Sequence, residues 1–189
     1  MSQLSEKKAD TDCLAGQLTA LISKDLFRLE ILKIVSQLNL PDCWVAAGFI
    51  RNLVWDHLHG VTTPLSDIDV IYYCTKDRSP YADLALEKQL NQSHVKALWS
   101  VKNQARMHSR NGDLPYQNCL HAMSYWPEKQ TAIAVRLDSN CEIELLHCFG
   151  LEELYSLKLT HNPKREKAIF EQRVLDKGWL KIWSQLSVN

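Results

Sequence analysis

Two aspartates, Asp67 and Asp69, stand two positions apart directly before the β-prone run Val70 to Tyr73. Because side chains alternate along a strand, both carboxylates should lie on one face, with their Cα atoms about 6.5 Å apart. Carboxylates at that separation can converge on a hard divalent cation such as Mg²⁺, which takes oxygen ligands and usually keeps water and substrate phosphates as the others. The pair therefore predicts a site for Mg²⁺ (or Mn²⁺) beside a phosphate-bearing substrate.

The residues before this pair predict a phosphate-binding turn. A short apolar run, Cys43 to Val45, leads to small residues that end at Gly48, and apolar residues then recur at helical spacing from Phe49 to Leu58. Gly60 is a natural helix stop. A glycine before a helix lets backbone N–H groups approach a phosphate, and a helix N-terminus favours negative charge. We expect Gly48 to bind the phosphates of a nucleotide and Arg51, one turn into the helix, to contact them as well.

Residues 47–53 together with the later D-x-D pair resemble the nucleotidyltransferase superfamily, whose members share a glycine-containing turn, a helix and a Dx[DE] metal site. The likeness is local but close to the tRNA CCA-adding branch, with its GGxVRDxLLG…DxD pattern. This chain departs from the pattern twice. Ala47 stands where the pattern has its first glycine, and Asn52 stands where it has an acidic residue after the arginine.

A longer likeness covers about residues 41–180 and is to a family of bacterial nucleotidyltransferase-like proteins. Its members carry an AGxxRxxxWD…DxDV start, a WxVKNQARMH segment, a PYxx…WPExxTA segment and a GLxDL segment. The corresponding residues here are 47–56, 99–108, 115–132 and 150–154. The resemblance implies a DNA polymerase beta-like fold and transfer of an NMP from an NTP. The acceptor stays open between a small molecule, a protein side chain and an RNA end.

Members of this superfamily usually draw a third carboxylate from a neighbouring strand, and the chain offers three candidates. Glu142 and Glu144 share one face of an expected strand, and Asp138 lies in the turn before it. Glu144 is the preferred choice because it sits deeper in the strand, between two apolar residues. The expected catalytic set is thus Asp67, Asp69 and Glu144. The alternative for Glu144 is an exposed edge-strand residue that limits aggregation.

The segment from Trp99 to His108 gathers polar side chains that suit a substrate pocket: Lys102, Asn103, Gln104 and Arg106. If the segment turns helical at residue 102, the two cations lie four apart on one face. Amides can bind a base or sugar, and cations can bind phosphate. The alternative is a solvated helix face. His108 is a candidate general base because histidine titrates near neutrality.

The bulk properties of the chain are those of an ordinary globular protein. It has 189 residues, 46% of them hydrophobic and 23% charged, and a formal net charge of zero, so no overall basic field attracts nucleic acid or anionic membrane. It has no apolar run of transmembrane length, no signal peptide, and six cysteines without CxxC or zinc spacing. We expect a cytoplasmic protein with reduced thiols and no membrane partner; the oligomeric state stays open. Residues 1–12 are expected to be flexible and residues 13–189 to form one nucleotidyltransferase-like domain with C-terminal helices.

Helical and strand patterns alternate along the chain. A long amphipathic helix is expected over residues 18–35, further helices over 81–90 and 163–177, and a hairpin from 132–137 and 142–146. The last helix carries basic residues that are expected to form a solvated face: Lys164, Arg165, Lys167 and Arg173. The mixture predicts an α+β fold with a small mixed or antiparallel twisted sheet and packed helices. Two functions stay open: a Mg-dependent nucleotidyltransferase, or a catalytically inactive nucleotide-binding or protein-interaction module that retains the fold.

Overall fold

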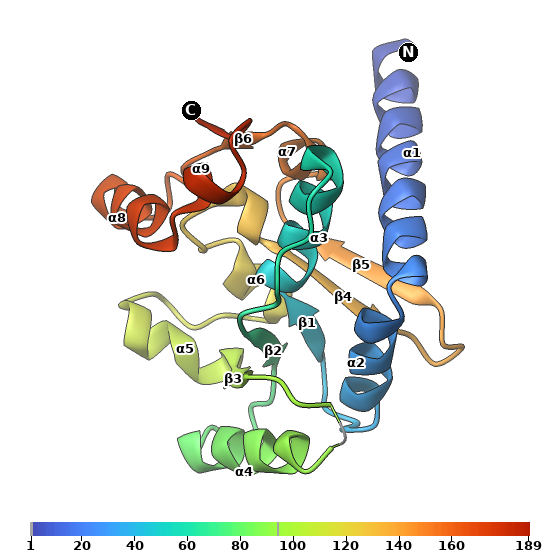
Figure 1. The fold of residues 1–189 in the computed structure, drawn as a ribbon. Helices are drawn as coiled ribbons and strands as arrows, with labels where there is room; N and C mark the ends of the chain where they lie inside the picture. The colour runs from blue at the N-terminus through green and yellow to red at the C-terminus, as the bar shows by residue number, and fades with distance from the viewer. Residues whose placement is uncertain (1, 94) are drawn as a thin grey trace.

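A five-stranded mixed sheet forms the centre of the computed structural model, which describes residues 2–93 and 95–189, with side chains from residue 10 onward (Figure 1). Its strands are β1 (Trp44–Ala46), β2 (Ile68–Tyr72), β3 (Trp99–Asn103), β4 (Ile133–Leu137) and β5 (Ile143–His147). They lie in the order β3-β2-β1-β4-β5, with β2 and β3 parallel and the other neighbouring pairs antiparallel. The predicted α+β fold with a small mixed sheet is confirmed.

Helices are spread along the whole chain: α1 (Ser2–Lys24), α2 (Leu26–Ser36), α3 (Gly48–His59), α4 (Pro80–Asn91), α5 (Gln104–Asn111), α6 (Cys119–Met123), α7 (Leu151–Tyr155), α8 (Lys167–Lys177) and α9 (Trp179–Ile182). A 3₁₀ turn, η1 (Lys129–Thr131), precedes β4, and two short strands, β6 (Lys158–Leu159) and β7 (Ser187–Val188), pair in parallel. Over the part of the chain that the structure describes, no helix is both long and apolar enough to cross a membrane.

The N-terminal helical region differs from the expected single helix. The chain is divided between α1 and α2 at Asp25, whose carboxylate caps α2 by accepting a hydrogen bond from the backbone N–H of Arg28 at 2.9 Å. Helix α1 begins at Ser2, within the segment predicted to be flexible, and Met1 lies outside the described residues. The flexibility of residues 1–12 in solution stays a prediction.

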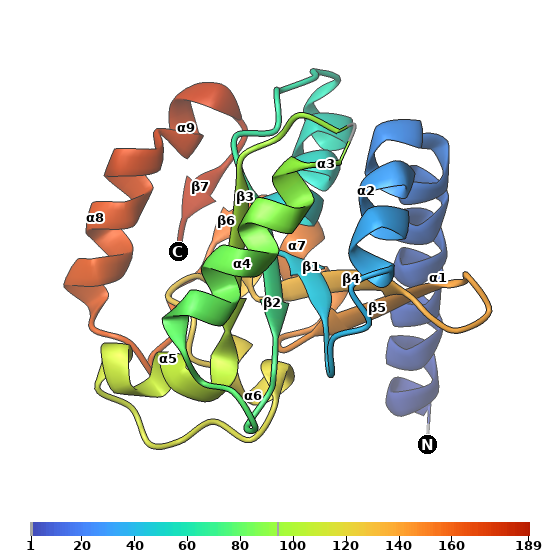
Figure 2. The same ribbon diagram turned by 90° about the horizontal axis from the view of Figure 1, so that it is seen from below.

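One face of the sheet forms the main hydrophobic core. Val45, Val70, Val101 and Val135 come from four different strands, are buried, and pack with apolar residues of α1, α2, α3 and α7. Figure 2 shows α1 and α2 side by side at one side of the molecule, with α8 and α9 at the other. The alternation of strand side chains therefore directs Ala46, Asp69 and their neighbours to the opposite face.

The C-terminal helices fold back onto the outer side of α3. Trp55 of α3 packs against Trp179 and Trp183, with ring centroids 5.8 Å and 5.1 Å away. The indole N–H of Trp183 also donates to the Asp56 carboxylate at 2.8 Å. These contacts attach α8 and α9 to the helix that begins at Gly48, so residues far apart in the sequence meet at that turn.

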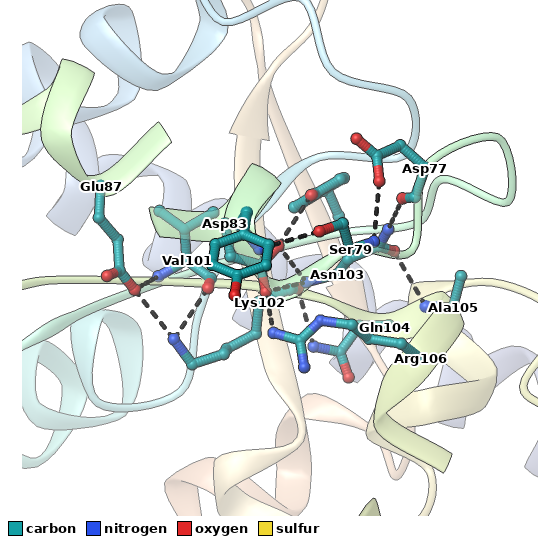
Figure 3. Close-up of polar contacts among 12 residues, drawn as sticks. Asp77, Ser79, Asp83, Glu87, Val101, Lys102, Asn103, Gln104, Ala105 and Arg106 are labelled. Atoms are coloured by element: carbon teal, nitrogen blue, oxygen red, sulfur yellow. Dashed lines mark hydrogen bonds and ion pairs between the residues drawn. The ribbon is translucent and has the colours of Figure 1, made fainter. Parts of the chain in front are cut away.

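The outer edge of β3 is covered by carboxylates of α4 instead of by another strand. The backbone N–H of Val101 donates to Glu87 at 2.8 Å, and that of Asn103 donates to Asp83 at 3.2 Å (Figure 3). Residues four apart on a helix are about 6 Å apart along its axis, which matches roughly 6.6 Å for residues two apart on a strand. Helix α4 thus satisfies the edge of β3 and fixes the residues that follow it.

Candidate active site

The two aspartates at the start of β2 line one cavity. Asp69 lies in register with Ala46 of β1 and Ser100 of β3, while Asp67 directly precedes the strand and accepts a hydrogen bond from the Ser66 hydroxyl at 2.6 Å. Both carboxylates are half-buried and both line a cavity of about 430 Å³. The structure therefore brings the D-x-D pair to one place, where two oxygen donors face a common space.

The electrostatics of this pair favour a cation. Burial raises the pKa of Asp69, and the negative charge of Asp67 raises it further. The Ser100 hydroxyl and the charges of Lys177 and Arg51 lower that pKa but do not cancel the rise. A divalent cation between the two carboxylates would remove their repulsion and favour the ionised form of Asp69. The chemistry of this donor set fits Mg²⁺ or Mn²⁺ with phosphate and water as further ligands.

The structure does not bring Glu144 to this pair. Strands β1 and β4 lie between β2 and β5, so Glu144 is three strands from Asp69, or about 14 Å at roughly 4.8 Å per strand. Its carboxylate instead accepts from Arg136 on β4 at 2.7 Å. The two alternatives belong to the same distant hairpin, where Asp138 accepts the backbone N–H of Glu142 at 2.9 Å. We therefore do not retain Glu144 as the third carboxylate.

The strand neighbours of Asp69 are not acidic. On its face of the sheet they are Ser100 on β3, Ala46 on β1 and, one strand further, Ala134 on β4. Asp176 of α8 lines the same cavity, but its carboxylate accepts from the Gln172 amide at 2.7 Å. Within residues 2–93 and 95–189, no three histidine, cysteine or acidic side chains lie close enough to hold a metal together. A bound cation would depend on Asp67 and Asp69.

The turn before α3 has an unusual backbone at Ala47. Its φ of 58° and ψ of −122° lie in a region that L-residues rarely adopt and that glycine enters freely. Its N–H donates to the Ile133 carbonyl at 2.9 Å, and its carbonyl accepts the N–H of Arg51 at 3.0 Å. At the next residue, a Cβ on Gly48 would lie 3.3 Å from the Arg51 guanidinium. Glycine is thus favoured at position 47 by the backbone conformation and at position 48 by the close approach of the Arg51 guanidinium. These two reasons account for the two glycines of the GGxVRDxLLG pattern.

Arg51 is a buried cation held in place from several sides. Only 6% of it is exposed, and its guanidinium donates to the Thr131 hydroxyl at 2.8 Å and to the side-chain amide oxygen of Asn52 at 3.0 Å. The guanidinium carbon lies 4.5 Å from the ring centroid of Trp179 and 5.1 Å from that of Trp55. Burial lowers the pKa of Arg51 to about 10, so the group stays charged at neutral pH. Because Asn52 is neutral, this neighbour does not compensate the positive charge.

A second cavity of about 570 Å³ lies on the other side of Asp69. The two cavities share four residues: Ala47, Asp69, Thr131 and Arg173. Two of the predicted pocket residues, Lys102 and Gln104, line the second cavity. Lys102 also forms an ion pair with Glu87 at 2.9 Å, and the Gln104 amide donates to the Lys102 carbonyl at 3.1 Å (Figure 3).

Asn103 does not face either cavity. It is fully buried, and its amide bonds the backbone N–H of Cys74 at 3.0 Å, the carbonyls of Cys74 and Asp77 at 2.8 Å, and the N–H of Ala105 at 3.0 Å (Figure 3). These bonds join the loop after β2 to the start of α5. Asn103 is therefore a structural residue, which corrects its predicted role in substrate binding.

Arg106 also points away from the cavities. Its guanidinium pairs with the buried Asp83 of α4, which also accepts from the Tyr72 hydroxyl at 2.8 Å. The reason is that β3 continues to Asn103 and α5 begins only at Gln104, so the expected helical face that joins residues 102 and 106 does not form. His108 likewise lines neither cavity.

Two arginines near the C-terminus, not predicted as site residues from the sequence, also line a cavity. Arg165 and Arg173 line the larger cavity, whereas the sequence predicts a solvated face for their segment. The Arg165 guanidinium donates to Asp113 at 2.8 Å, and that of Arg173 donates to the buried Glu128 at 2.5 Å. No local pattern separates these two from the neighbouring Lys167, because the orientation of α8 is set by its packing against Trp55 of α3 and the tryptophans that follow α8.

Comparisons with known proteins agree with this geometry. The model of a protein family described as Nucleotidyltransferase matches residues 33–188. An NMR structure described as revealing a CCA-adding enzyme head domain has a TM-score of 0.81 and 30% identity, covering 92% of this chain and 95% of that one. No curated protein matches the chain.

Two more distant structures share the fold. A CCA-adding enzyme in complex with CTP has a TM-score of 0.57 and 14% identity, covering 91% of this chain and 43% of that chain. The Thermotoga maritima CCA-adding enzyme complexed with tRNA_CCA has a TM-score of 0.53 and 16% identity, covering 87% of this chain and 38% of that one. The chain therefore spans less than half the length of these two enzymes.

Proposed function

Because the chain belongs to the nucleotidyltransferase family, we propose that it transfers an NMP from an NTP to an acceptor with the help of Mg²⁺ or Mn²⁺. The observation that carries this proposal is the meeting of Asp67, Asp69, Gly48 and Arg51 at one cavity. Two carboxylates, a glycine at a helix start and a buried cation are the groups that a metal-bound triphosphate requires.

Each residue has a separate part in this proposal. Asp67 and Asp69 would hold the metal, which when bound neutralises charge on the phosphates. The backbone at Gly48 lets phosphate oxygens approach the N-terminus of α3, and Arg51 and Lys177 donate to them. An acceptor oxygen then forms a bond to the α-phosphorus while the bond to the bridging oxygen breaks. Pyrophosphate leaves with the electron pair, and the hydroxyl proton passes to water.

A second candidate function is favoured by one observation. The strand neighbours of Asp69 on its face are Ser100, Ala46 and Ala134, so the sheet offers no third carboxylate to orient an attacking hydroxyl. A module that binds a metal–nucleotide complex without turnover would need only the D-x-D pair and the phosphate-binding turn. The two functions make the same prediction for binding and differ in the release of pyrophosphate.

Binding and turnover are tested in sequence. We expect a thermal-shift screen of the four NTPs with Mg²⁺ or Mn²⁺ to show stabilisation that needs the metal and is lost in the Asp67→Asn/Asp69→Asn variant. Glu144→Gln is the matched control, because it removes a carboxylate elsewhere on the same sheet. Pyrophosphate release with pools of small molecules, proteins or RNA then supports transfer. Metal-dependent binding without release from any pool supports the binding module, and the absence of metal-dependent NTP binding contradicts both.

A further inference from the structure

We propose, on the basis of the function above, that the larger cavity binds the acceptor and that the acceptor is a small hydroxyl-bearing molecule with a phosphate group. Along the β2 segment, Asp67 lines only the smaller cavity, Ile71 only the larger one and Asp69 both, so the cavities lie on either side of Asp69, where the α-phosphate would bind. In an in-line displacement, the attacking and leaving oxygens are on opposite sides of the phosphorus. If pyrophosphate leaves on the side of Gly48 and Arg51, the hydroxyl arrives from the larger cavity.

Positive charge predominates in the lining of the larger cavity. Its lining holds four cationic side chains and a single acidic one: Lys102, Arg110, Arg165, Arg173 and Asp69. The carboxylates that pair with three of these cations stand outside the lining: Glu87, Asp113 and Glu128. The cavity therefore faces the cations, with the carboxylates behind them to hold them in position. Such an arrangement is suited to an anion, and phosphate matches the donor geometry of arginine.

Arg110 is the lining cation whose charge is most available to a ligand. It is exposed in the last turn of α5 and forms no ion pair within the part of the chain that the structure describes. Gln104, Met107 and Asn111 line the cavity from the same helix at spacings of three and four residues, so α5 presents one continuous face to it. Both ribbon views place α5, which carries Arg110, and α8, which carries Arg173, on the side of the molecule away from α1 and α2 (Figures 1 and 2).

The size of the larger cavity and its other lining groups suit a small ligand. A volume of about 570 Å³ is typical of sites for small organic ligands. Tyr125 and Trp126 add aromatic rings to the lining, and Gln104 and Asn111 add amide groups that can bind hydroxyls. The formal net charge of zero provides no general attraction for a long polyanion. These features favour a sugar phosphate or a molecule of similar size over a nucleic acid.

The test measures a phosphate-bearing probe in the presence of a bound nucleotide. Ribose 5-phosphate is titrated calorimetrically into the protein saturated with Mg²⁺ and the α,β-methylene analogue of the NTP that stabilises it best. We expect binding that Arg110→Ala weakens about fivefold, the value for one exposed charge-assisted hydrogen bond. Arg78→Ala is the matched control, because Arg78 is also exposed but lies in the loop between β2 and α4. The affinity for the NTP analogue should be the same in both variants.

Three outcomes overturn the proposal: no binding of ribose 5-phosphate, competition between it and the NTP analogue, or equal affinities of wild type and the Arg110→Ala variant. A failure of the proposed function is recognised separately. If the analogue does not bind, ribose 5-phosphate is titrated into the free protein and into the Arg110→Ala and Arg78→Ala variants. Selective loss in Arg110→Ala then supports an anion site without nucleotidyl transfer, and equal binding contradicts the site itself.

Discussion

Replacement of Ala47 by glycine should separate the strain in the phosphate-binding turn from the contribution of its side chain. At φ 58° and ψ −122°, an alanine is held in a conformation that destabilises an L-residue by roughly 1–3 kcal/mol. Ala47→Gly removes this strain. The same substitution loses roughly 0.5–1 kcal/mol to the greater freedom of glycine in the unfolded chain and roughly 0.8 kcal/mol from the buried methyl group.

These opposing terms nearly balance, so a matched control is needed to isolate the strain. Ala46 is the adjacent residue, is fully buried, and has the extended backbone of β1. Ala46→Gly should therefore show only the two unfavourable terms and destabilise the protein by about 1.5 kcal/mol. Ala47→Gly should change the free energy of unfolding by less than about 1 kcal/mol, and it should be the more stable variant by about 2 kcal/mol.

Equilibrium unfolding in urea, followed by tryptophan fluorescence, measures both free energies. In thermal unfolding, a difference of 2 kcal/mol corresponds to about 4–8 °C for a domain of this size. Equal destabilisation by the two glycines would refute the strained turn. It would also remove our explanation for the glycine pair in related sequences.

Two further predictions concern residues whose contacts in the structure differ from the roles predicted from the sequence. Asn103→Ala should reduce the free energy of unfolding by about 2–4 kcal/mol, because it removes four hydrogen bonds made by a buried side chain, and it should leave nucleotide affinity per folded molecule unchanged. Urea unfolding and calorimetry check this, and a selective loss of affinity would contradict it. Glu144→Gln should leave metal-dependent nucleotide affinity within about twofold of wild type, because Glu144 lies three strands from Asp69 and its carboxylate pairs with Arg136. A loss of affinity comparable to that of Asp69→Asn would show that Glu144 belongs to the site.

Some of the predicted placements depend only on local periodicity. Asp67 and Asp69 share a face because strand side chains alternate, and Arg51 faces the turn because it lies one helical turn after Gly48. Both relations act over a few residues of continuous chain. They do not depend on the rest of the fold, so they can be recognised before the order of the strands is known.

The parts that sequence reasoning missed depend on tertiary arrangement. Glu144 has suitable chemistry, but its distance from Asp69 is set by the order of the strands, and β1 and β4 lie between them. Asn103 and Arg106 changed roles because β3 extends to residue 103, and this reverses which side chains face the cavity. The position of Arg173 in the cavity lining is set by the packing of α8. None of these relations has a signature in local composition or spacing.

The central claim is that Asp67 and Asp69 form a metal-dependent binding site for the phosphates of an NTP. Calorimetric titration of the wild-type protein with an NTP, with Mg²⁺ and with EDTA, tests it most directly beside the Asp67→Asn/Asp69→Asn variant. We predict that affinity in Mg²⁺ exceeds affinity in EDTA by at least about tenfold in the wild type and that this difference disappears in the variant. A variant that retains the full metal-dependent affinity would contradict the claim.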